Sequence, residues 1–189
     1  MFKKLFGGSP PRKIGALGQT VRALYPRLVL DVDVSDIAQA LEAWAWLEPP
    51  APLPDLIVPF GDMFFDTPRG VIMLDTMEGA LNVVADSAAA FVEALDQDHY
   101  RDEILGDVWV QAVSRRGLVL APGESFDWTI APILGGRCSV EAITKGSFVV
   151  NVNIAGQLHR QIKALPPGTP IGKITISDEA PARPIVTPR

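Results

Sequence analysis

The sequence predicts an α+β domain in which a mostly antiparallel sheet, a β-meander, packs with a few helices. Between residues 56 and 85, short apolar runs are separated by turn signals such as Thr67-Pro68-Arg69-Gly70, which is typical of a meander. Before and after this region, apolar residues recur at spacings of three and four, which indicates helices. Because strands and helices do not alternate regularly, the pattern favours α+β over a doubly wound parallel sheet.

The N-terminal part predicts a helical extension over residues 1–50. Residues 9–24 begin with Ser-Pro-Pro and place these apolar side chains on one helical face: Ile14, Leu17, Val21 and Leu24. Residues 27–34 alternate apolar and polar side chains, which predicts a strand or an extended lead-in. Ser35 is then expected to cap a helix over 36–47. The proline-rich segment 49–54 follows as a rigid connector.

The domain after the connector is predicted to begin with the meander and to continue with helices. Its expected strands are Leu56–Phe60, Met63–Asp66, Val71–Leu74 and Leu81–Ala85. Asp86-Ser87 opens a helix that runs to about Leu95. A second helix is expected from Tyr100 to Arg115, and Gly117 ends it.

The last third of the chain predicts two strands, a short helix and a final strand. The strands come from alternation at Phe126, Trp128 and Ile130, and again at Phe148, Val150, Val152 and Ile154. Leu158, Ile162 and Leu165 then predict a helix that stops at Pro166-Pro167-Gly168. Residues 171–176 form the last expected strand. We therefore predict one domain over 51–177, followed by a disordered tail over 178–189.

Composition excludes several classes of protein. The chain has 189 residues, of which 48% are hydrophobic and 21% charged, as in an ordinary globular protein. A single cysteine excludes an internal disulfide framework and favours a cytoplasmic protein. No run approaches the roughly 20 apolar residues of a membrane span, so no membrane association is expected.

Charge is distributed in blocks along the chain. Residues 1–30 carry six Lys or Arg and no Asp or Glu, whereas residues 31–107 carry seventeen Asp or Glu against two Lys or Arg. Folding could interleave these blocks into a mixed surface, or it could produce one acidic face that docks on a basic protein. Because an acidic block repels phosphates, direct binding of nucleic acid is not expected.

No catalytic, metal or cofactor site is predicted from motifs. Asp31, Asp33, Ser35 and Glu42 fit parts of a calcium-loop pattern, but Asp36 occupies the position that needs glycine. His99, His159 and Cys138 lack the spacing of a zinc site, and Gly135-Gly136 precedes no clear helix for a phosphate loop.

Several short segments together resemble one known bacterial domain family. They are Gly61-Asp62-Met63-Phe64-Phe65-Asp66, Val71-Ile72-Met73-Leu74-Asp75-Thr76, Val84-Ala85-Asp86-Ser87, Phe91, Pro122-Gly123-Glu124, Leu134-Gly135-Gly136, Gly156-Gln157-Leu158-His159 and Leu165-Pro166-Pro167-Gly168-Thr169. In this order and spacing they are similar to the C-terminal domain of an immunity protein that neutralises a DNase effector of bacterial type VI secretion. The family was formerly a domain of unknown function, and the resemblance extends from about Trp44 to Ile176.

The resemblance implies an immunity protein that is not an enzyme and that acts by binding a cognate nuclease effector. Better-known members carry an N-terminal partner domain that resembles the GAD domain, whereas only about 50 residues precede the connector here. The family implies no catalytic residues for this chain, and its motifs are turns and strand cores. The oligomeric state is not predicted.

The acidic block supplies the predicted partner-binding surface. We expect the effector to be contacted by Asp62, Asp66, Asp75, Glu78, Asp96, Asp98, Asp102 and Glu103. Two alternatives remain open at this point. One is a module that binds a small molecule or peptide between the sheet and the helices, and the other is a hydrolase built from scattered carboxylates or Cys138.

Overall fold

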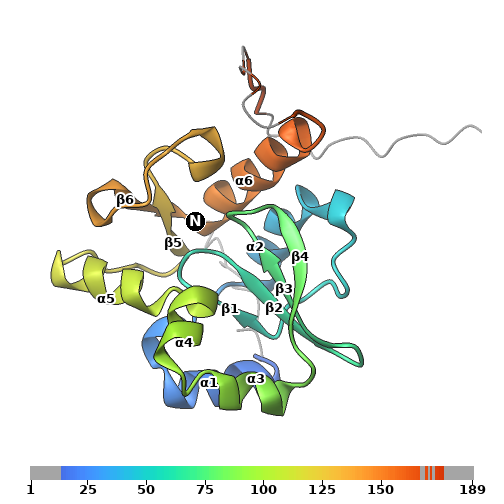
Figure 1. Cartoon of the computed structure of the whole chain (residues 1–189), viewed down its shortest axis with the longest axis vertical. Helices are drawn as coiled ribbons and strands as arrows, with labels where there is room; N and C mark the ends of the chain where they lie inside the picture. The colour runs from blue at the N-terminus through green and yellow to red at the C-terminus, as the bar shows by residue number, and fades with distance from the viewer. Residues whose placement is uncertain (1–13, 167–168, 170, 172, 177–189) are drawn as a thin grey trace, which may run out of the picture.

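The computed structural model describes residues 14–166, 169, 171 and 173–176 and confirms the α+β class (Figure 1). A four-stranded antiparallel sheet has the order β1-β2-β3-β4, as expected for a meander. Its strands are β1 (Leu56–Ile57), β2 (Met63–Thr67), β3 (Gly70–Asp75) and β4 (Ala80–Ala85). A separate antiparallel hairpin is formed by β5 (Glu124–Trp128) and β6 (Ile143–Ser147).

Helices cover both faces of the four-stranded sheet. On one face, Phe64 belongs to a core shared with α1 (Ala16–Leu24), α3 (Ala88–Ala94) and α5 (Asp107–Arg115). On the other face, Met63 and Phe65 pack with α2 (Val34–Glu42) and α6 (Phe148–Ile162). Antiparallel sheets often leave one face in water. Here both faces are buried, and the buried positions 63–65 and 71–74 of the central strands are accordingly all apolar.

Both N-terminal helices form with shifted starts. α1 begins at Ala16 after Gly15 at its N-cap, and the predicted start at Ser9-Pro10-Pro11 lies outside the described residues. No strand forms over the predicted 27–34: Pro26–Leu28 is a 3-10 turn, residues 29–33 are a lead-in without regular structure, and Val34 begins α2. The Leu30 N–H donates to the Ile57 carbonyl at 2.8 Å. The prediction that Ser35 caps α2 was wrong, because Asp33 holds the extended N-cap position and its carbonyl accepts the first helical bond from Ile37. A 3-10 turn at Ala45–Leu47 follows α2.

The helices after the sheet differ from prediction at one glycine. Ser87 caps α3 as expected, and its side chain accepts a hydrogen bond from the Ala90 N–H. The single helix predicted over 100–115 is in fact two, α4 (Asp98–Leu105) and α5. They are separated by Gly106, whose φ of 68° lies in the left-handed region that glycine tolerates best. This break turns α5 away from the axis of α4.

The strand predicted over Phe148 to Ile154 was wrong, because these residues begin the long helix α6. Phe148 and Val152 are buried, whereas Val150 is 51% exposed and Ile154 39% exposed. Two residues four apart lie on the same side of either a strand or a helix, so the apolar run fits both periods. Ser147 favours the helix over the strand, because its side chain caps the helix by accepting a hydrogen bond from the Val150 N–H. The strand that pairs with β5 lies just before it.

The end of the chain also differs from prediction. The described residues of 171–176 form no strand, and Thr175 instead exchanges two hydrogen bonds with the Gln161 side chain on α6. The predicted tail 178–189 lies outside the described residues. The boundary at the proline connector stays a prediction, although α1 and α2 pack into the same two cores as the sheet.

Candidate partner-binding site

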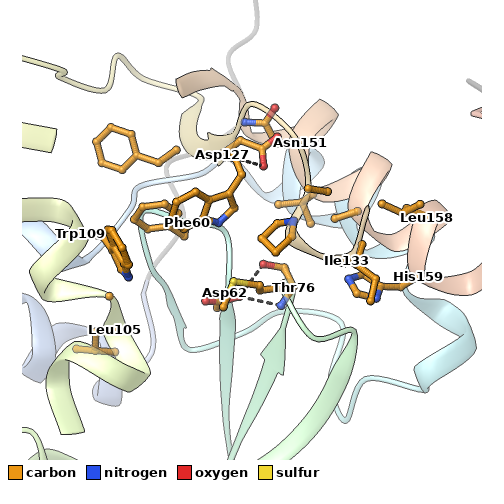
Figure 2. A pocket seen from close by; sticks show the side chains of 18 of the residues that line it. Phe60, Asp62, Thr76, Leu105, Trp109, Asp127, Ile133, Asn151, Leu158 and His159 are labelled. Atoms are coloured by element: carbon orange, nitrogen blue, oxygen red, sulfur yellow. Dashed lines mark hydrogen bonds between the residues drawn. The ribbon is translucent and has the colours of Figure 1, made fainter. Parts of the chain in front are cut away.

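A cleft opens at one end of the four-stranded sheet, between the α4–α5 pair and α6 (Figure 2). Its floor comes from the β1–β2 and β3–β4 connections, which antiparallel pairing places at the same end of the sheet. The β5 strand and the first part of the β5–β6 connection complete the wall. The cavity volume is about 130 Å³.

Four aromatic rings form one side of this cleft. Phe60 lies between β1 and β2, and its ring stacks against that of Trp128 on β5 with 5.7 Å between centroids. Trp109 on α5 meets Trp128 edge-on at 5.3 Å, and Phe126 lies 5.5 Å from Phe60. The Phe126 N–H donates to the Pro59 carbonyl at 2.8 Å, which fastens β5 to the loop that carries Phe60. Interlocked rings of this kind make a rigid surface.

Four carboxylates line the same cleft, and no Lys or Arg does so among its described residues. They are Asp62, Asp102, Glu103 and Asp127. None of the four forms an ion pair within the part of the chain that the structure describes. Arg101 on α4 does not pair with these carboxylates. It forms ion pairs with Asp98 at 2.6 Å and with Asp107 at 2.9 Å. The cleft is therefore negatively charged without local compensation.

Asp62 is held rigidly at the bottom of the cleft. The N–H and the hydroxyl of Thr76 both donate to its Oδ1, at 2.8 and 2.6 Å (Figure 2). Burial, with a further contribution from the negative charge of Asp75, raises the pKa of Asp62 to about 6, against the opposing effect of the Thr76 bonds. Among the described residues no donor binds Oδ2, so one carboxylate oxygen keeps its hydrogen-bonding capacity for another molecule.

Asp127 and His159 face the cleft from the other elements. Burial raises the pKa of Asp127, and its Oδ1 accepts a bond from the Trp128 N–H at 2.8 Å. Burial lowers the pKa of His159 on α6, in opposition to the Thr76 carbonyl and the carboxylates of Asp75 and Glu78. The imidazole is therefore neutral near pH 7 and does not offset the carboxylates.

The structure brings together part of the acidic set predicted from the sequence. Asp62, Asp102 and Glu103 line the cleft. Asp75 and Glu78 lie beside it, where Oδ1 of Asp75 accepts bonds from the N–H groups of Met77 and Glu78 in the β3–β4 turn. The other three lie outside the cleft lining: Asp66 on β2, Asp96 after α3, and Asp98, which pairs with Arg101.

Sequence reasoning missed Asp127 and the aromatic wall. Their signal in the sequence is slight: Asp127 lies between Phe126 and Trp128 on a strand, where alternation assigns it to the face opposite Phe126. Nothing in the sequence indicates that this strand passes beside Asp62 and Trp109, since that proximity depends on how the hairpin docks on the sheet.

An apolar loop borders the cleft. Residues 129–142 connect β5 to β6 and contain 3-10 turns at Pro132–Leu134 and Val140–Ala142. Ile130 is 58% exposed, Ile133 41% and Leu134 40%, and Ile133 also lines the cleft. Exposed large apolar side chains next to a charged concavity are characteristic of protein-binding surfaces.

The described residues contain neither a metal-binding cluster nor a membrane-spanning helix. They contain no group of three or more His, Cys, Asp or Glu side chains arranged to hold a metal ion. No helix among them has both the length and the apolar character needed to cross a membrane. Cys138 is exposed on the β5–β6 connection.

Comparison with known proteins gives one family. Residues 85–159 match the model described as T6SS immunity protein Tdi1, C-terminal. This confirms the resemblance over a narrower range than the expected 44–176, from the end of β4 into α6. No match was found among curated proteins or among solved structures. Over residues 85–159, the chain is therefore similar to the C-terminal domain of the type VI secretion immunity protein Tdi1.

Proposed function

We propose that this protein protects its cell by binding a cognate nuclease effector of type VI secretion, with the acidic cleft and its apolar border as the contact surface. The observation that carries the proposal is the uncompensated charge of the cleft. Asp102, Glu103 and Asp127 all lie within the matched range 85–159 and face one concavity that no Lys or Arg lines among the described residues.

The chemistry of nucleases supports an acidic contact. A nuclease must hold a polyanionic backbone, so its substrate cleft carries a positive potential. An acidic protein is steered to such a cleft and covers it, which blocks the substrate without any reaction. In this proposal the protein acts stoichiometrically, in the compartment where the nuclease would meet DNA, and it needs no catalytic residue.

Charge and apolar contacts have separate roles in the proposed complex. Electrostatic attraction raises the association rate, and buried apolar and aromatic anchors set the lifetime of the complex. The exposed side chains of Ile130, Ile133 and Leu134 border the carboxylates and would supply such anchors.

A small-molecule site in the same cleft is a second candidate, favoured by the aromatic wall. Pockets for drug-sized ligands enclose about 300–1,000 Å³. The cleft encloses about 130 Å³, which suits part of a protein side chain better than a whole ligand of that size.

Co-expression tests the proposal directly. The nuclease encoded next to this protein should stop growth when it is expressed in the cytoplasm, and co-expression of the full chain should restore growth. The two proteins should also co-purify as a stable complex. Restored growth without any complex, or a complex in which the nuclease remains fully active, would contradict neutralisation by binding.

A further inference from the structure

We propose that the cleft receives one arginine side chain of the effector, with its guanidinium stacked on the aromatic wall and bonded to the surrounding carboxylates. This inference rests on the proposed function, because it names the group of the effector that the site would take.

The occupant is assigned as a cation from the charges on the lining. Four carboxylates approach the cavity from three different parts of the fold: Asp62 from the β1–β2 connection, Asp102 and Glu103 from α4, and Asp127 from β5. The histidine on the opposite side is neutral near pH 7 because burial lowers its pKa. An anion would meet only repulsion here, whereas a single cation can reach carboxylates on several sides.

The aromatic wall selects a planar cation. Trp128 stacks with Phe60 at 28° between ring planes and meets Trp109 at 87°, so ring faces and edges border the same space. A guanidinium lies flat on such rings, is more weakly hydrated than an ammonium, and carries five donors in a fixed fork. A lysine would bring only a strongly hydrated point charge.

The volume of the cleft favours a side chain over a free ligand. About 130 Å³ accommodates a guanidinium and the adjacent methylenes, and the apolar border at Ile133 would contact the stem of the same residue.

In the free protein, the charged forms of two of these carboxylates are destabilised by burial, and a bound cation would remove this cost in free energy. Burial raises the pKa of both Asp62 and Asp127, so their charged forms are held where water solvates them poorly. A guanidinium would replace the lost solvation, and among the described residues no donor binds Oδ2 of Asp62. Groups whose pKa values are shifted in this way by burial are commonly found at functional sites.

The experiment uses three small probes on the full chain: N-acetyl-arginine amide, its lysine analogue and its uncharged citrulline analogue. The chain has four tryptophans, and their indole N–H signals in an NMR titration report where each probe binds. Trp109 and Trp128 line the cleft, whereas Trp44 and Trp46 pack near α2 and serve as internal controls. The arginine probe should shift the first pair only, with a dissociation constant on the order of 10 mM or tighter.

The lysine probe should bind several-fold more weakly, and the citrulline probe should give no saturable shift. Asp127→Asn should weaken arginine binding roughly tenfold, because it removes one charge-assisted partner. Asp86→Asn makes the same change at an exposed carboxylate outside the cleft and should leave binding as in wild type. Absence of arginine binding, equal binding of all three probes, or equal effects of the two substitutions would overturn the inference.

These outcomes are separable from those of the co-expression test, because the probes need no effector. If the chain protects cells and binds the nuclease while the arginine probe leaves Trp109 and Trp128 unshifted, only the arginine inference fails. If the probe binds in the cleft but the chain neither binds the nuclease nor protects cells, the proposed function fails.

Discussion

At the scale of single residues, Asp62 shows the conflict between stability and binding most directly. The folded protein gives this carboxyl a pKa of about 6, against 3.8 without the fold. The folded state therefore holds a proton more tightly than the unfolded state, and stability falls as pH rises from about 4 to about 6. Above that range the carboxyl is ionised while partly buried, which lowers the free energy of unfolding. A cation from a partner would offset that cost.

Asp62→Asn should stabilise the free protein at neutral pH. The amide oxygen can still accept both Thr76 bonds, while the unfavourable charge is removed. We expect the free energy of unfolding at pH 7.5 to rise by about 1–3 kcal/mol, and the gain to shrink steadily as pH falls from 6 to 4. Denaturant titrations of both proteins across this range measure the difference, with the exposed Asp86→Asn as the control. A gain that did not depend on pH would contradict the assigned pKa.

The same residue should make effector binding depend on pH. The groups that face it are Asp75 at the end of β3, Asp102 and Glu103 on α4, Asp127 on β5, and His159, whose pKa is lowered. Protonation of Asp62 removes one charge from the cleft. The affinity for the effector should therefore fall as pH drops from 7.5 to 5.5, and this fall should be smaller in Asp62→Asn. Calorimetric titration at several pH values would measure both slopes, and equal slopes would exclude this contribution of Asp62.

At the scale of elements, α6 connects the cleft to the second core. Trp44 donates through its indole N–H to the Val152 carbonyl at 2.9 Å, and Gly156 lies directly against Ala43. A Cβ on Gly156 would approach the Ala43 Cβ at 2.8 Å and its carbonyl oxygen at 2.9 Å. The glycine thus allows α6 to approach the end of α2 closely, and this approach positions Leu158 and His159 beside the cleft.

Gly156→Ala should destabilise the protein even though alanine is the better helix former. The gain in helix propensity is at most about 1 kcal/mol, whereas forcing a methyl group into a filled contact costs about 1–3 kcal/mol. We expect a net loss of about 1–2 kcal/mol, measured by chemical denaturation. Val150→Ala on the exposed side of α6 should change stability by less than about 0.5 kcal/mol. A Gly156→Ala variant as stable as wild type would show that α6 can move away from α2 without cost.

The elements also show what sequence periodicity can and cannot determine. The meander was predictable because the short apolar runs and the turn residues between them agree with each other from Leu56 to Ala85. The helix at Phe148 was not, because Phe148 and Val152 satisfy a strand and a helix equally, and only the exposure of Val150 in the folded protein separates the two. The break at Gly106 was missed because glycine is also tolerated inside helices, so its left-handed φ depends on packing.

At the scale of the whole molecule, three carboxylates of the acidic block line the cleft that we propose as the binding site. Asp62, Asp102 and Glu103 come from the acidic block and meet at one cleft. Asp127 and the rings of Trp109 and Trp128 could not be predicted with them, because their proximity arises when β5 docks through Phe126 on the loop after β1. Acidic residues such as Asp66 lie elsewhere on the fold, and a local count of charges cannot separate the two groups.

The association rate with the effector should depend on ionic strength. Salt screens exposed charges over a distance of about 8–10 Å near physiological concentration. Between 0.05 and 0.5 M NaCl we expect the association rate constant to fall about tenfold or more, with a much smaller change in the dissociation rate constant. Stopped-flow mixing of the purified proteins would measure both. A salt-independent association rate would mean that steering by the acidic surface does not contribute.

The affinity of the full chain for its effector tests the central claim most directly when two matched double variants are compared. Glu103→Gln with Asp127→Asn removes two charges inside the cleft, and Glu93→Gln with Asp86→Asn removes two exposed charges outside it. Net charge changes equally in both proteins. We predict that the first pair weakens binding about 100-fold and abolishes protection in co-expression, while the second stays within about threefold of wild type. Equal affinities for the two variants would contradict the assignment of the cleft as the binding site.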